Sequence, residues 1–219
     1  HKMSEKDKEL TAYHEAGHAI AAYHLETQDA VHQLSIIPRG MAGGFTMQLP
    51  SEDKPYVSKN YLLDEIVVLL GGRVAETIVF GDINSGASSD IERATEIARK
   101  MITRYGMSDE LGPVMYGSSN DEVFLGRDFS SSRNYSEAIA AEIDEQIKKI
   151  ITDAYNRCEK ILRDNLGQLE TVAKYLIKNE KADGEVFKLL MSGEFKEEPE
   201  AATEPETVAE TKTETSTEE

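Results

Sequence analysis

The sequence predicts a mainly α-helical fold with a small β-sheet. Long segments carry apolar residues at helical spacing, whereas only two short segments have the composition and alternation of strands. Hydrophobic residues make up 39% of the 219 residues and charged residues 30%, which is a globular composition with a surplus of charge. No internal repeat is visible, so we expect one packed domain rather than an array.

The predicted elements follow from capping residues and periodicity. Ser4 can cap the first helix together with Asp7, three residues later. Ile139, Ile143 and Ile147 share one face of the longest helix. In chain order we expect helices at residues 5–25, 58–80, 90–106, 136–163, 166–179 and 184–191, with strands at 31–40 and 45–50.

Glycine and small polar residues mark the helix ends and one unusual helix interior. Ser88 or Ser89 is expected to cap the third helix, and Asp183 the last one. The pair Gly71–Gly72 lies inside the second helix, where each glycine costs about 1 kcal/mol relative to alanine. We therefore expect this pair to pack closely against another backbone.

Charge and cysteine content exclude some classes of protein. A formal net charge of −17 argues against broad nucleic-acid binding, because phosphate contacts need a basic surface. The single cysteine, Cys158, allows no internal disulfide; it fits a reducing compartment and a packed position in a helix. No apolar run approaches the roughly 20 residues of a membrane helix, and no signal peptide is visible.

The first helix carries a metal-binding pattern, within the run TAYHEAGHAIAAYH. His14 and His18 are one helical turn apart and share a face, while Glu15 is turned about 100° from His14. This is the His-Glu-x-x-His spacing of zinc peptidases, in which two histidines hold the ion and the glutamate acts as general base. The alternative, two surface histidines on an amphipathic helix, does not explain why alanine and glycine surround them.

The third metal ligand is not determined by the residues alone. His24 has the spacing of a third histidine ligand, but Ala21 stands where that pattern needs a turn glycine, so a continuing helix points His24 elsewhere. His24 and His32 are expected to be exposed, and His1 is taken as a remnant of the expression vector. The remaining candidates are Glu65, Glu76 and Asp90, and their positions do not choose among them.

Several further segments resemble the peptidase domain of the FtsH family of ATP-dependent, membrane-anchored zinc metalloproteases. They are HEAGHA, TMQLP, LLGGRVAE, GASSDIERAT, LGPVMYG, FLGR and DGEVFKLL, in this order along the chain. The resemblance implies a helical zinc metallopeptidase domain at residues 8–195, with a long C-terminal helix and short helices after the His-Glu-x-x-His helix. It also implies that Asp90 is the third zinc ligand, together with His14 and His18, and that Glu76 supports a ligand histidine without binding the metal.

By the same resemblance, the expected function is hydrolysis of unfolded polypeptides at one Zn²⁺ per chain, with Glu15 as general base. In the full-length protein, a homo-hexamer would use ATP to degrade misfolded and membrane proteins, with the peptidase domain on the cytoplasmic or equivalent side. This piece would be soluble, because it has no membrane span, and it would lack the ATPase domain, because it has no phosphate-loop motif. Its negative net charge predicts that it binds no nucleic acid. The alternative function is a non-catalytic helical oligomerisation scaffold with a structural or vestigial metal site.

The two ends of the chain are expected to lie outside the folded domain. Residues 1–7 are taken as a remnant or linker that contains the helix start. Residues 196–219 are rich in Glu, Thr, Ala and Pro, and this composition predicts an acidic disordered tail.

Removing the tail after Phe195 is therefore expected to leave the fold and the proteolytic activity unchanged, because the tail has too little apolar surface to add to the core. The midpoint of thermal unfolding, measured for the truncated and full chains, checks this. A large loss of thermal stability on truncation would contradict the disordered-tail prediction.

Overall fold

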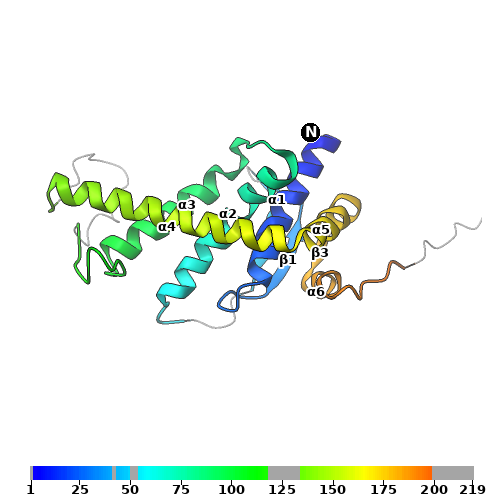
Figure 1. Ribbon diagram of the computed structural model, residues 1–219. Coiled ribbons are helices and arrows are strands. Elements are labelled where there is room, and N and C mark those ends of the chain that lie inside the picture. The colour runs from blue at the N-terminus through cyan, green and yellow to red at the C-terminus, as the bar shows by residue number, and fades with distance from the viewer. Residues whose placement is uncertain (1, 41–42, 50–53, 118–133, 199–219) are drawn as a thin grey trace, which may run out of the picture.

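A computed structural model describes residues 2–40, 43–49, 54–117 and 134–198 (Figure 1). Within these ranges it confirms a mainly helical chain with one small antiparallel sheet. The elements are α1 Glu5–Tyr23, β1 Val31–Ser35, β2 Phe45–Gln48, α2 Lys59–Phe80, the 3-10 helix η1 Ser85–Ala87, α3 Ser88–Thr103, α4 Glu137–Asp164, α5 Leu166–Asn179, β3 Lys181–Asp183 and α6 Gly184–Ser192.

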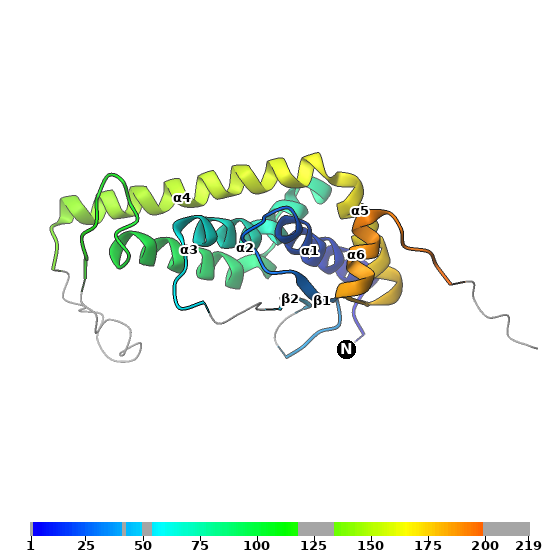
Figure 2. The same cartoon turned by 90° about the horizontal axis from the view of Figure 1, so that it is seen from below.

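The helices form a layer that is covered on one side by the longest helix. In Figure 2, α4 runs along the upper side of the molecule across α1, α2 and α3, and β1 and β2 lie on the opposite side. Helices α5 and α6 pack at the end where α1 meets the sheet. Ile143, Cys158 and Leu162 of α4 are almost fully buried, so the predicted apolar stripe of this helix faces the core.

The sheet has the strand order β2-β1-β3 and is antiparallel throughout. Leu34 in the central strand pairs with Thr46 of β2 on one side and with Ala182 of β3 on the other. The sequence predicted β1 and β2 but not β3. The strand β3 has only three residues, of which only Ala182 is buried, so it is too short to show an alternating pattern.

The pair α1 and α2 makes a backbone-to-backbone contact, as the glycines predicted. A Cβ atom built on Gly17 would lie 2.3 Å from the carbonyl oxygen of Gly71, and one built on Gly71 would lie 2.7 Å from that of Gly17. A Cβ atom on Gly72 would collide with the ring of His14, at 2.3 Å from Cε1. Glycine at these three positions therefore sets both the helix separation and the space for the histidine.

Most predicted helix caps are confirmed. Ser4 and Asp183 accept hydrogen bonds from Asp7 N and Val186 N, respectively. The predicted cap at Ser88 or Ser89 is wrong, because η1 runs directly into α3 and both serines lie inside that helix. Instead the side chain of Asn84 caps η1, one turn earlier.

Other features agree with the sequence within the described residues. Cys158 is fully buried, and burial raises the pKa of its thiol to about 12, so it is not a reactive thiolate at neutral pH. None of the described helices is both long enough and apolar enough to cross a membrane. His1, the segment FLGR and residues 199–219 of the predicted tail lie outside the described residues, and the domain boundaries stay a prediction.

The Gly17–Gly71 contact predicts that Gly17→Ala destabilises the protein despite the better helix propensity of alanine. The new methyl group must push two backbones apart, and such overpacking costs about 1–3 kcal/mol, more than the gain of about 1 kcal/mol from propensity. Chemical denaturation monitored by circular dichroism measures the free energy of unfolding.

The matched control is Gly167→Ala in α5, where a Cβ atom would meet nothing within 4 Å. This variant is expected to be as stable as the parent chain or slightly more stable. If both variants gained stability, the close contact of α1 with α2 would be contradicted.

Candidate metal centre

The imidazoles of His14 and His18 lie side by side on the face of α1 that packs against α2. Their ring centroids are 4.8 Å apart, and the two Nε2 atoms are 3.1 Å apart. Both residues are buried, each with 8% of its surface exposed. The spacing of four residues on a helix therefore brings the two rings together, as the sequence predicted.

Each imidazole also makes a hydrogen bond through Nδ1, the nitrogen that faces away from the other ring. His18 Nδ1 lies 2.7 Å from the carbonyl oxygen of Val68, and His14 Nδ1 lies 2.7 Å from Glu76 Oε1. A carbonyl and a carboxylate can only accept, so each Nδ1 carries the hydrogen and donates it. In a neutral ring the lone pair is then on Nε2, and the two lone pairs face each other.

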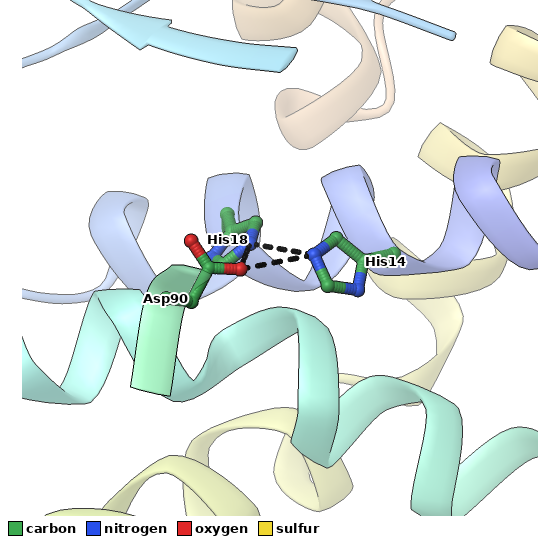
Figure 3. A group of neighbouring side chains, drawn as sticks. All are labelled: His14, His18 and Asp90. Atoms are coloured by element: carbon green, nitrogen blue, oxygen red, sulfur yellow. Dashed lines mark hydrogen bonds and ion pairs between the residues drawn. The ribbon is translucent and has the colours of Figure 1, made fainter. Parts of the chain in front are cut away.

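Asp90 completes a group of three. It lies in the first turn of α3, and its Oδ2 is 3.2 Å from His14 Nε2 and 3.2 Å from His18 Nε2. Figure 3 shows the Asp90 carboxylate from α3 and the two rings from α1 pointing toward one another. One ligand atom from each of the three residues lies within 4.8 Å of the others.

This donor set fits a divalent cation. One proton on His14 Nε2 cannot point at both His18 and Asp90 with good geometry, whereas a cation among the three atoms contacts all of them. Two imidazole nitrogens and one carboxylate oxygen suit zinc, and a histidine whose other nitrogen donates to a carboxylate or carbonyl is the usual form of a zinc ligand.

The pKa shifts of His14 and Asp90 indicate that the imidazoles and the carboxylates of this group interact strongly. Burial lowers the pKa of His14, but hydrogen bonds with Asp90 and Glu76 outweigh burial and raise the pKa from 6.5 to about 10. Burial raises the pKa of Asp90, but hydrogen bonds with His14 and His18 outweigh it and hold the pKa well below its usual value. A proton and a divalent cation therefore compete for the same position among these side chains.

Glu15 lies beside this group without belonging to it. Its side chain is buried, and its Oε2 accepts a hydrogen bond of 2.7 Å from the hydroxyl of Thr46 on β2. The Thr46 hydroxyl is also 3.0 Å from the main-chain oxygen of Glu15. Thr46 thus holds one oxygen of the Glu15 carboxylate.

The group opens into a cavity of about 950 Å³. Strand β2, the helices α1 and α2, and the segment from Asn84 to Asp90 contribute its walls. The cavity is lined by His14, Glu15, His18, Thr46 and Asp90, so a molecule that enters it reaches the candidate ligands and Glu15 together.

The other candidate ligands lie apart from the group. Glu65 lines the same cavity, and burial raises its pKa while Arg93 acts in the opposite direction, but it is not among the converging residues. His24 is exposed and its Nε2 is 2.7 Å from Gln168 Oε1; His32 is exposed as well.

Three partners of the site were not singled out from the sequence: the carbonyl of Val68, the hydroxyl of Thr46 and the side chain of Asn84. A main-chain carbonyl leaves no signal in side-chain patterns. Thr46 lies in the predicted strand at residues 45–50, but the alternation of a strand does not say which side chain meets Glu15. Asn84 lies in a polar loop, where asparagine is common for turn formation alone.

Comparison with known proteins agrees with the fold and the geometry. Residues 1–190 match peptidase family M41. The chain is 59% identical over 192 residues to ATP-dependent zinc metalloprotease FtsH 1 of Thermoanaerobacter sp. (strain X514). The aligned residues make up 88% of this chain and 31% of that protein. The chain is 57% identical over 188 residues to the ATP-dependent zinc metalloprotease FtsH of Caldicellulosiruptor bescii, covering 86% of this chain and 30% of that protein.

A third relative is the ATP-dependent zinc metalloprotease FtsH of Bacillus subtilis (strain 168), which is 48% identical over 190 residues, covering 86% of this chain and 30% of that protein. The chain thus spans less than a third of the length of these relatives. A family match over most of the chain, together with these identities, shows that the chain belongs to peptidase family M41.

Proposed function

We propose that this chain is a zinc-dependent endopeptidase domain. The observation that carries the proposal is the convergence of His14 Nε2, His18 Nε2 and Asp90 Oδ2 beside Glu15, within an open cavity. His14, His18 and Asp90 would hold the ion. Membership of peptidase family M41 and the names of the relatives, which are zinc metalloproteases, support this assignment.

A bound zinc ion supplies Lewis-acid polarisation of the scissile carbonyl and lowers the pKa of an attacking water. Glu15 Oε1 would accept the proton of that water and later deliver it to the leaving amine nitrogen. Thr46 would steady the Glu15 carboxylate through its hydrogen bond of 2.7 Å to Oε2. Glu76 and the Val68 carbonyl accept from the Nδ1 atoms of the two imidazoles, and this tautomer would leave each Nε2 available to hold the ion.

Strand β2 offers a docking edge for the substrate. Within the described part of the chain β2 pairs only with β1, and its residues Phe45–Gln48 line the cavity. An extended polypeptide could add to this edge through main-chain hydrogen bonds, which are largely independent of sequence. Such docking suits unfolded polypeptides as substrates.

The proposal for the whole protein is wider. ATP-driven delivery of misfolded and membrane proteins, a homo-hexameric assembly and attachment to a membrane are supported by the family resemblance, and the names of the relatives include ATP dependence. A non-catalytic scaffold with a closed metal site is less well supported, because among the described residues only three side chains converge and they face a cavity.

Glu15→Gln is expected to abolish proteolysis while the metal stays bound. Glutamine keeps the size of the side chain but cannot take up a proton, and loss of a general base typically lowers the rate by about 10²–10⁴. Casein digestion, with and without a chelator, measures the activity, and elemental analysis of protein prepared without chelator should give about one zinc per chain.

The matched control for this prediction is Glu65→Gln, the same substitution in the wall of the same cavity. It should digest casein at close to the parent rate. Undiminished digestion by Glu15→Gln would remove Glu15 as the base, and absence of stoichiometric zinc from the parent chain would contradict the metallopeptidase proposal.

Asp90→Ala is expected to weaken zinc binding by at least about tenfold, because it removes the only anionic member of the ligand group. Glu65→Ala should leave the zinc dissociation constant unchanged. Competition with a chromophoric chelator measures both constants. If Glu76→Ala removed the metal while Asp90→Ala retained it, the ligand assignment would be wrong.

A further inference from the structure

Asn84 joins two parts of the candidate metal centre through a single side chain. Its Nδ2 donates a hydrogen bond of 3.0 Å to Glu76 Oε2, and its Oδ1 accepts one of 2.7 Å from the main-chain nitrogen of Gly86. The orientation of this amide is forced, since a carboxylate can only accept and a backbone N–H can only donate. Both ends of the side chain are therefore committed.

The partner of Asn84 is one of the most deeply buried acids of the protein. Glu76 has 2% of its surface exposed, and its two oxygens have different partners: Oε1 meets His14 Nδ1 at 2.7 Å, and Oε2 meets Asn84. A buried carboxylate needs a donor for each oxygen, because an unsatisfied one costs the full desolvation of that group. The carboxylate that holds His14 is thus itself held by Asn84.

The same asparagine shapes the segment that carries Asp90. By accepting from Gly86 N it caps η1, which continues without interruption into α3, and Asp90 lies in the first turn of α3. The main-chain oxygen of Asn84 also accepts from Arg73 Nη2 at 3.4 Å, so α2 holds the backbone of this residue independently of its side chain.

We infer that Asn84 is a positioning residue of the metal centre, which acts through Glu76 on the imidazole of His14. The inference rests on the proposed zinc site. Without the amide donor, Glu76 Oε2 loses its partner, the carboxylate can rotate, and His14 Nδ1 loses the fixed acceptor that directs Nε2 toward His18 and Asp90. The consequence is weaker metal binding, because partners of this kind are typically worth about 10–100-fold in metal affinity.

Two substitutions distinguish the hydrogen bond that Asn84 donates to Glu76 from the one that it accepts from Gly86 N. Asn84→Ala removes both hydrogen bonds of the side chain. Asn84→Asp keeps an oxygen that accepts from Gly86 N, but it places a second carboxylate opposite Glu76, so only the bond to Glu76 is lost. The matched control is Asp82→Ala in the same loop, because Asp82 is exposed and caps only the neighbouring Ile83 N.

The experiment measures the zinc dissociation constant of each variant by competition with a chromophoric chelator, and the visible absorption spectrum after cobalt substitution. Asn84→Ala and Asn84→Asp should each raise the dissociation constant by roughly tenfold and change the cobalt spectrum, which reports ligand geometry. Asp82→Ala should match the parent chain in both measurements. If Asn84→Ala fails to fold, as judged by circular dichroism, Asn84→Asp decides.

A double-mutant cycle tests whether Asn84 acts through Glu76. In a Glu76→Ala background, Asn84→Asp should change the dissociation constant by less than about twofold, because it keeps the cap of η1 and the group through which Asn84 acts is gone. The full tenfold loss in that background would overturn the inference, and so would a parent-like affinity and spectrum of Asn84→Asp. If the parent chain binds zinc, either of these results would contradict the Asn84 inference alone. If the parent chain binds no zinc, the proposed function would be contradicted as well.

Discussion

The contact of the α1 backbone with the α2 backbone is the constraint on which the candidate site depends. Gly17 and Gly71 remove the side chains that would separate the helices, and Gly72 leaves room for the ring of His14. At this separation α2 can hold both histidines from behind, with the Val68 carbonyl for His18 and the Glu76 carboxylate for His14. A wider spacing would leave both Nδ1 atoms without acceptors, and the Nε2 atoms would no longer have a defined direction. Gly71 and Gly72 lower the helix propensity of α2, but they allow the close packing that fixes both histidines.

The second constraint is electrostatic. Glu15, Glu76 and two histidines are buried in one region, although burial of charge normally costs several kcal/mol unless each group has a partner. The partners here are mutual: burial lowers the pKa of His14, but Asp90 and Glu76 outweigh it, and burial raises the pKa of Asp90, but the two histidines outweigh it. The first turn of α3 also favours a negative charge at Asp90 through the helix dipole. Asp90 is thereby kept ionised and could serve as a ligand. The negative charge of Glu76 and Asp90 is balanced either by a proton on the histidines or by a metal cation among the three side chains.

Much of this fold was predictable from local signals, because helix caps and apolar spacing act over a few residues. The bounds of α5 and the caps at Ser4 and Asp183 agree with the prediction. The roles of the downstream acids were not predictable from the residues alone, and Glu65 and Glu76 show the geometric reason. Glu65 and Glu76 are eleven residues apart, which is about 20° around the helix axis but about 16 Å along it. Periodicity therefore places both acids on the same side of α2. Which of them meets His14 depends on the position along the α2 axis at which α1 packs, and the sequence does not give this position. The choice of Asp90 came from the family resemblance, and its role as a ligand stays a prediction.

The segment between Glu76 and Asp90 explains how a supporting residue and a candidate ligand can be positioned together. Glu76 is near the end of α2, and the chain returns through Gly81, which takes a left-handed conformation, and the short helix η1. Such a tight return leaves few polar groups to satisfy Glu76 Oε2, and Asn84 is the side chain that reaches it. Asn84 therefore links the acid that supports His14 with the segment that carries Asp90. This link adds to the packing of α2 against α3 and η1 and to the hydrogen bond of Arg73 with the main chain of Asn84, so the precision of the site depends on this loop as much as on the His-Glu-x-x-His helix.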